Sequence, residues 1–180
     1  MKTLILNCSP VRDGATAFIC ALAAEVMSER GEVRSVCIND YSFSFCRGCR
    51  SCHLTGKCVM SDGVDKLMAE LDEADRILFV SPSYWADVPG QFKAFIDRCT
   101  PWSNTHEPHA SLRGGKLSYS IVLRTGGGMK ECERLISTIE HYCGHLEITP
   151  SGSLALCSVD GKAAAEARSE EIISFCRGML

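Results

Sequence analysis

Four of the chain's twelve cysteines fall within one short segment, at a spacing that suits a metal centre. They follow the pattern C-x2-C-x2-C-x5-C and are Cys46, Cys49, Cys52 and Cys58. Four thiolates are the ligand set of an iron–sulfur cluster, and consecutive x2 spacings are typical of ferredoxin-type runs. Structural zinc usually takes two C-x2-C pairs set well apart, so zinc is the weaker interpretation. The alternative without metal is a loop of reduced thiols that lines a ligand site or a subunit contact.

The surroundings of these cysteines agree with a negatively charged ligand. Arg47, Arg50 and Lys57 lie within the same segment and would offset the charge of a thiolate-bound cluster. The other eight cysteines are scattered beside apolar residues, where a free cysteine behaves as a small hydrophobe. The N-terminal apolar stretch is too short for a signal peptide, so we expect reduced thiols and a cytoplasmic protein.

A second candidate site is a loop that joins a short apolar run to a helical pattern. Ser9 and Thr16 offer hydroxyl groups, Arg12 offers charge, and Gly14 stands just before the helix. A helix N-terminus presents unpaired N–H groups and a positive dipole end, which suit a phosphate. The segment is neither a Walker loop nor GxGxxG. An ordinary helix cap explains it equally well.

Two further loops carry features that suit a flat ligand. Pro82-Ser83-Tyr84-Trp85 places two aromatic side chains after a buried strand, where they could stack on a ring or contact another subunit. Thr125-Gly126-Gly127-Gly128 would let the backbone approach a planar ligand closely, although a flexible turn is the simpler interpretation.

Apolar runs and helical periodicities alternate along the whole chain. This alternation predicts a parallel sheet with helices on both faces. Five strands suggest the flavodoxin-like order 2-1-3-4-5, whose ligand crevice lies at the carboxyl ends of strands 1 and 3. We therefore expect one domain, 1–180, with a cysteine-rich loop at 45–60. The predicted strands are 3–8, 33–38, 76–80, 119–123 and a broken fifth at 146–148 and 153–157; the predicted helices are 15–30, 64–71, 91–97, 132–143 and 163–177.

Composition narrows the class of partner. The chain has 180 residues, of which 46% are hydrophobic, and a formal net charge of −3. That balance argues against a nucleic-acid surface. No apolar run approaches the roughly 18 residues of a membrane helix, so we expect no membrane partner.

A phosphate site, an aromatic wall and a close-approach backbone together fit FMN. The sequence resembles the NADPH-dependent FMN reductase family over nearly its whole length, through Ser9-Pro10, Gly14, Thr16, Ser81 to Trp85 and Val88 to Arg98. The resemblance implies that the FMN phosphate lies in the first loop and the ring lies against the other two. The expected FMN-binding residues are Ser9, Arg12, Gly14, Ala15, Thr16, Pro82, Ser83, Tyr84, Trp85, Thr125, Gly126 and Gly127.

Two departures from the family pattern bear on this site. Cys8 stands where the family often has glycine, and Ala15 stands where it often has asparagine. Losing that asparagine removes a potential phosphate contact, so we expect weaker binding of FMN.

Three functions are compatible with these features. The first is an FMN-dependent oxidoreductase that passes electrons from NAD(P)H to a flavin, a quinone or another small acceptor. The second follows from a resemblance of the cysteine spacing to iron–sulfur flavoproteins: an electron carrier with FMN, a four-iron four-sulfur cluster and a ferredoxin-like donor. The third is a flavin-free interaction domain. Hydride transfer to a flavin needs stacking and exclusion of water, so we expect no catalytic side chain. We expect a homodimer or homotetramer.

Overall fold

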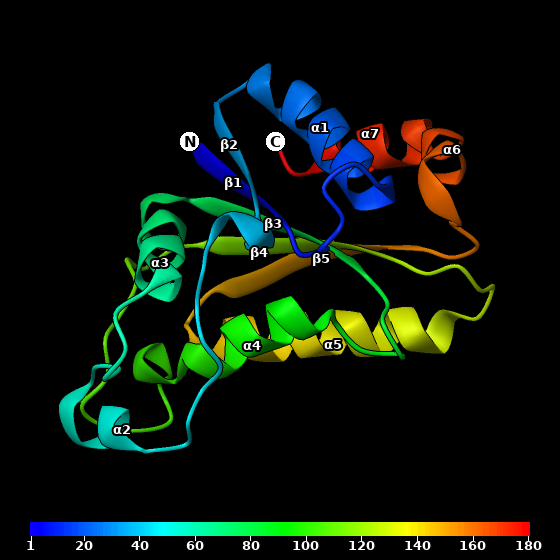
Figure 1. The fold of residues 1–180 in the computed structure, drawn as a ribbon. Helices are drawn as coiled ribbons and strands as arrows, with labels where there is room; N and C mark the ends of the chain where they lie inside the picture. The colour runs from blue at the N-terminus through cyan, green and yellow to red at the C-terminus, as the bar shows by residue number, and fades with distance from the viewer.

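The computed structural model describes residues 1–180 and contains one five-stranded parallel sheet (Figure 1). The strand order is β2-β1-β3-β4-β5, which confirms the predicted flavodoxin-like topology. Strands β1, β3 and β4 occupy the centre because their runs are apolar on both faces. The strands are β1 (Lys2–Asn7), β2 (Glu32–Cys37), β3 (Arg76–Pro82), β4 (Leu117–Leu123) and β5 (Thr149–Leu156).

Helices cover both faces of this sheet, as Figure 1 shows. One face carries α1 (Ala15–Ser28), α6 (Gly161–Glu166) and α7 (Ser169–Gly178), and the other carries α3 (Gly63–Glu73), α4 (Gly90–Arg98) and α5 (Met129–His145). The short α2 (Ser51–Thr55) lies away from the sheet, in the cysteine segment. Short 3-10 turns occupy Ile38–Asp40 and Thr100–Trp102. None of the helices is both long and apolar enough to cross a bilayer.

Each central strand contributes side chains to two separate hydrophobic cores, because its side chains alternate between the two faces of the sheet. Leu4 and Leu6 of β1 pack into the core beneath α3, α4 and α5, whereas Ile5 packs beneath α1 and α7. Phe79 and Val80 of β3 divide in the same way. Both cores therefore hold the carboxyl ends of β1 and β3 in fixed positions.

The predicted fifth strand and terminal helix were wrong in detail. β5 is continuous from Thr149, and 146–148 lies outside it. It passes through Pro150 because an edge strand has one side without a partner, where the missing N–H costs little. The terminal helix is split at Arg168, whose side chain donates to the Cys157 carbonyl (3.3 Å) and to Glu171. Helix α2 was not predicted, since 45–60 was expected to form a loop.

A buried arginine holds the cysteine segment onto this framework. Arg98 ends α4 and is only 1% exposed. Its guanidinium donates to the Ser44 carbonyl (2.7 Å), to the Asp62 carboxylate (2.8 and 3.2 Å) and to the Met60 carbonyl (3.4 Å). Ser44 directly precedes the cysteine-rich loop 45–60, and Met60 is the last residue of that loop. One side chain thus fixes both of its ends.

Replacing this arginine should destabilise the protein strongly. We expect Arg98→Met to lower the free energy of unfolding by about 3 kcal/mol, because a buried ion pair and two carbonyl groups lose their partner. Urea denaturation measures the change. Lys93→Met on the same helix removes an exposed pair with Asp97 and should cost less than about 1 kcal/mol. Equal losses in the two variants would contradict this assignment.

Candidate cofactor and cluster sites

The loops after β1, β3 and β4 meet at the carboxyl edge of the sheet, as predicted. The Cys8 N–H donates to the Val80 carbonyl at 2.9 Å, which ties the first loop to β3. The Ser83 N–H donates to the Leu123 carbonyl at 2.7 Å, which ties the second loop to β4. The candidate phosphate, ring and glycine segments therefore border one region.

The first loop leaves the N-terminus of α1 available to a ligand. Gly14 precedes the helix without a side-chain cap, and the first turn contains no acidic residue. Ser9 and Thr16 are both buried there. Because the Ser9 hydroxyl oxygen accepts from the Val11 N–H (3.1 Å), its own proton is left to donate. Unpaired N–H groups and a free hydroxyl proton match a phosphate.

Arg12 does not join this arrangement. Its guanidinium donates to Asp40 at 2.6 Å and to the Asn39 carbonyl at 3.1 Å. Asp40 also accepts from the Cys37 N–H, and these two hydrogen bonds hold the pKa of Asp40 below its ordinary value. The guanidinium is thus paired outside the helix terminus, and its contact with a phosphate stays a prediction.

The second loop exposes the ring of Trp85 on a strained stretch of backbone. Pro82 and Ser81 belong to β3, where they pair with β4, so the loop is shorter than predicted. A tight turn follows, in which the Tyr84 N–H donates to the Asp87 carbonyl at 2.8 Å. Trp85 and Ala86 both have positive φ, 55° and 61°. Non-glycine residues there cost about 1 kcal/mol or more each. Trp85 is fully exposed, so its ring packs on nothing within the chain.

The third loop is organised by two charged residues that the sequence analysis missed. Arg124 pairs with Glu131 (3.2 Å) and donates to the Gly128 carbonyl (2.8 Å), while Ser83 donates to Glu131 (3.0 Å). A Cβ on Gly126 would clash with the guanidinium of Arg124. That glycine therefore gives room to Arg124. A charged residue directly after a buried strand was the available signal.

The four cysteines of the C-x2-C-x2-C-x5-C motif line a single cavity of about 30 Å³. Asp97, Arg98 and Thr100 are among the other residues of its wall. The Gly48 N–H points at Cys46 Sγ (3.5 Å), a contact that stabilises thiolate sulfur. The donor set fits an iron–sulfur cluster. The cavity is smaller than a four-iron core, so the exposed stretch 46–50 must open outward to admit one.

Titratable and charged groups lie close together in this segment. Burial raises the pKa of Cys52, and the neighbouring Cys58 and Cys49 add to the rise, because nearby negative charge disfavours a further thiolate. The Cys58 thiol also lies beside Arg98. Burial opposes the charge on Arg98, but Asp62 and Cys58 outweigh it and keep the pKa of Arg98 above its ordinary value. The His53 ring stacks on the His106 ring next to Cys52, with the ring centroids 4.2 Å apart. The sequence did not reveal this arrangement.

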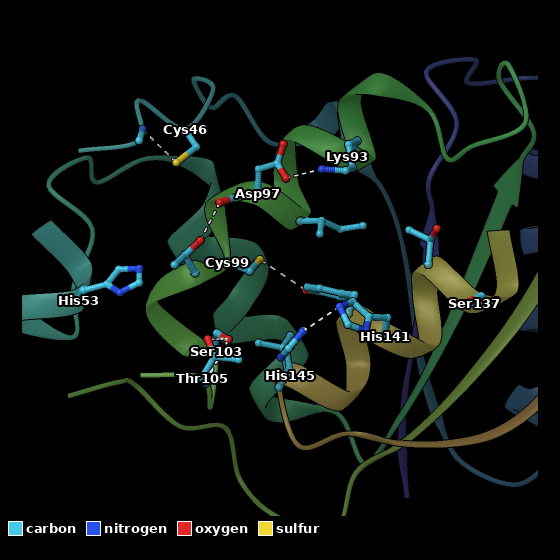
Figure 2. A pocket seen from close by; sticks show the side chains of 16 residues that line it. Cys46, His53, Lys93, Asp97, Cys99, Ser103, Thr105, Ser137, His141 and His145 are labelled. Carbon is cyan, nitrogen blue, oxygen red and sulfur yellow. Dashed lines mark hydrogen bonds and ion pairs between the residues drawn. The ribbon is translucent and has the colours of Figure 1, made fainter. Parts of the chain in front are cut away.

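A larger cavity of about 820 Å³ adjoins the cysteine segment (Figure 2). Cys46, Asp97 and Thr100 line both cavities. Figure 2 shows His141 and His145 of α5 at its wall, with their Nε2 atoms 2.9 Å apart. None of the residues of the three loops lines it. The space therefore belongs to the cysteine side of the molecule.

The sheet order and the helices on both of its faces define a flavodoxin-like protein. The family model of NADPH-dependent FMN reductases matches residues 1–158, and the chain belongs to that family. This confirms the resemblance drawn from Ser9 to Thr16 and from Ser81 to Arg98.

Curated relatives carry a more specific name. An "Iron-sulfur flavoprotein" of Archaeoglobus fulgidus is 34% identical over 73% of this chain and 58% of its own length. "Iron-sulfur flavoprotein MJ1083" of Methanocaldococcus jannaschii is 33% identical over 56% of this chain and 53% of its own length. The chain thus spans about half the length of the curated relatives it matches.

Solved structures agree on the fold. The "NAD(P)H:quinone oxidoreductase from Methanothermobacter marburgensis" superposes with a TM-score of 0.79 at 14% identity, covering 99% of this chain and 96% of the other. An "FMN-dependent NADH-azoreductase" of Bacillus anthracis, solved with FMN, gives 0.72 at 12% identity and covers 99% and 98%.

Because Trp85 is strained and its ring is exposed, replacing it should increase the stability of the protein and decrease its affinity for FMN. We expect Trp85→Gly to raise the free energy of unfolding by about 0.5–1 kcal/mol, because glycine adopts positive φ without strain. The same variant should bind FMN more weakly, since the exposed ring is lost. Calorimetry and FMN titration measure the two effects.

Ala86→Gly is the matched control. It relieves strain in the same turn without touching the ring, so it should stabilise the protein and leave the affinity for FMN unchanged. If the wild type and Trp85→Gly bound FMN with equal affinity, Trp85 would not be part of the FMN site.

The Asp62–Arg98 pair predicts a pH dependence of stability. Burial alone would raise the pKa of Asp62, but hydrogen bonds from Arg98, Val64 and Ser44 outweigh it and lower the pKa. The unfolded carboxyl, at about 3.9, therefore takes up its proton first as the pH falls. The stability advantage of the wild type over Asp62→Asn should be full above about pH 5 and should shrink below about pH 4.

The exposed Asp13 provides the comparison for this measurement. At pH 7, where Asp62→Asn should show its full loss, Asp13→Asn should change the unfolding free energy by less than about 0.5 kcal/mol in urea denaturation. An Asp62→Asn difference that is independent of pH would contradict the ion pair.

Proposed function

We propose that this protein is an FMN-dependent oxidoreductase whose four-cysteine segment holds an iron–sulfur cluster, so that electrons pass between cluster and flavin. The observation that carries the proposal is the cavity lined by all four cysteines and floored by the buried Arg98. The names of the curated relatives support it.

The FMN would be held by groups that the fold already positions. The phosphate suits the N-terminus of α1 with Ser9 and Thr16, and the ring suits the space beside Trp85 and Gly126. Bound FMN supplies the redox chemistry. The chain's contribution is to orient the ring and to exclude water from one side of it. Arg124, whose Nε is buried without a partner, places a positive charge at the same edge.

The cysteine segment would supply the ligands of a four-iron four-sulfur cluster. Arg47, Arg50 and Lys57 lie close to the thiolates in sequence, and Arg98 lies beneath them, so the local charge opposes that of the cluster. Such a cluster supplies one-electron transfer. Its natural donor would be a ferredoxin-like protein.

A second candidate is a reductase in which NAD(P)H supplies the electrons to FMN and a quinone, a flavin or another small molecule accepts them. The fully exposed Trp85 favours it, because a shelf open to solvent leaves room for a nicotinamide to stack. The two functions share the flavin and differ in the donor.

Exposed apolar side chains support an assembly of copies. Phe45, Leu54 and Val59 lie around the cysteines, and Trp85 and Met129 lie near the rim. Large apolar groups left in water at two separate places are typical of contact surfaces. We therefore propose a homodimer or homotetramer, which sedimentation velocity would test.

Iron analysis tests the cluster. Protein purified without oxygen should contain about four iron and four sulfide per chain, and Cys49→Ser should lose most of the iron while its circular dichroism stays unchanged. The reason is that Cys49 lies on the exposed segment and contributes nothing to the sheet.

Cys37→Ser is the matched control because Cys37 is partly exposed and lies outside the motif. It should keep its iron. Wild-type protein that is yellow, free of iron and rapidly bleached by NADH or NADPH would establish the second candidate instead. Protein that stays colourless after reconstitution with FMN would refute both.

A further inference from the structure

Two cysteines outside the motif lie side by side behind the third loop. Cys132 is in the first turn of α5, and Cys157 is the first residue after β5. Their sulfur atoms are 4.0 Å apart. No other two cysteines in the chain share a hydrogen bond.

The two sulfur atoms differ in access. Cys132 is fully buried, whereas Cys157 is partly exposed and its thiol also lies 3.7 Å from the Gly128 carbonyl. A small solute can therefore reach Cys157 from outside. Cys132 stands directly behind it, where a resolving thiol would be needed.

We propose that Cys132 and Cys157 form a redox-active dithiol that hydrogen peroxide converts into an intrachain disulfide. The proposal does not depend on the function assigned above, because it needs neither FMN nor a cluster.

The reaction balances with peroxide as the only oxidant. The Cys157 thiolate attacks one peroxide oxygen; an S–O bond forms, the O–O bond breaks, and the leaving hydroxide takes a proton to become water. The Cys132 thiolate then attacks the Cys157 sulfur; the S–S bond forms, the S–O bond breaks, and a second water leaves. Two thiols lose two electrons and two protons in total.

The required movement is small and falls on adaptable segments. The sulfur atoms must approach from 4.0 Å to the bonding distance of about 2.0 Å. Cys157 lies outside the strand, and Cys132 lies in a terminal turn. Burial and the neighbouring Cys157 raise the pKa of Cys132 to about 11, while Arg124 acts in the opposite direction. The second step should therefore be slow at neutral pH and faster in mild alkali.

The disulfide would lock the third loop. The Ser158 N–H donates to the Gly126 carbonyl and the Val159 N–H to the Arg124 carbonyl, each at 2.9 Å. The segment after β5 is thus already bonded to the loop, and a bond to Cys132 would join both to α5. The disulfide would then restrict the movement of Arg124, which is hydrogen-bonded to the segment after β5, and of Glu131, which lies next to Cys132 in α5.

Peptide mapping after peroxide treatment tests the proposal. Digestion after glutamate places Cys132 in peptide 132–133, Cys143 in 141–147 and Cys157 in 148–166, so each possible link gives a distinct mass. We expect peroxide to link 132–133 to 148–166, with a loss of two hydrogen atoms that a reductant reverses. The link should form several-fold faster at pH 9 than at pH 7.

Matched serine variants complete the experiment. Cys132→Ser and Cys157→Ser should not form this link, whereas Cys143→Ser, a buried cysteine of the same helix, should form it as the wild type does. Since mapping of the wild type alone is decisive, a variant that misfolds does not spoil the test. The proposal is overturned if Cys132 and Cys157 stay unlinked while other cysteines oxidise.

Discussion

The ion pair between Arg98 and Asp62 is the interaction on which the cysteine site depends. Asp62 caps α3 by accepting from the Val64 N–H (3.1 Å), and Arg98 ends α4, so their contact fixes two helices relative to each other. The same guanidinium holds the carbonyl groups of Ser44 and Met60. A segment with few apolar contacts of its own thereby acquires fixed ends, while its middle stays exposed. Rigid ends with an open middle suit a ligand set that must admit a bulky group.

The sheet was predictable from sequence because its central strands are short apolar runs between helical periodicities. The three loops were predictable for the same reason: parallel strands bring their carboxyl ends together. Arg98 was not predictable, since its partners lie 36 and 54 residues away and nothing local marks an arginine as buried. β5 was misread because Pro150 and Gly152 look like a break, whereas an edge position tolerates both. The ion pair of Arg12 with Asp40 likewise depends on a contact across 28 residues.

Polar groups left without protein partners gather at the carboxyl edge of the sheet. The N-terminus of α1 has no side-chain cap, Arg124 has an unpaired Nε, and Trp85 is held in strained backbone with its ring in water. Outside this edge, the buried side-chain atoms without a partner are the Nε atoms of Arg76 and Arg98. Leaving several polar groups unsatisfied in one place lowers the stability of the free protein. A ligand can satisfy these groups together, so the same arrangement favours binding.

Helix α4 sets the distance between the proposed flavin ring beside Trp85 and the four-cysteine segment. The strained turn that carries Trp85 precedes its first residue, and Arg98 is its last. Nine residues of helix rise by about 13 Å, which makes α4 a fixed spacer between ring and thiolates. Adding or removing one residue would swing the arginine by about 100° around the helix axis and point it away from its carboxylate. The length of this helix is therefore constrained as strictly as the identity of any residue on it.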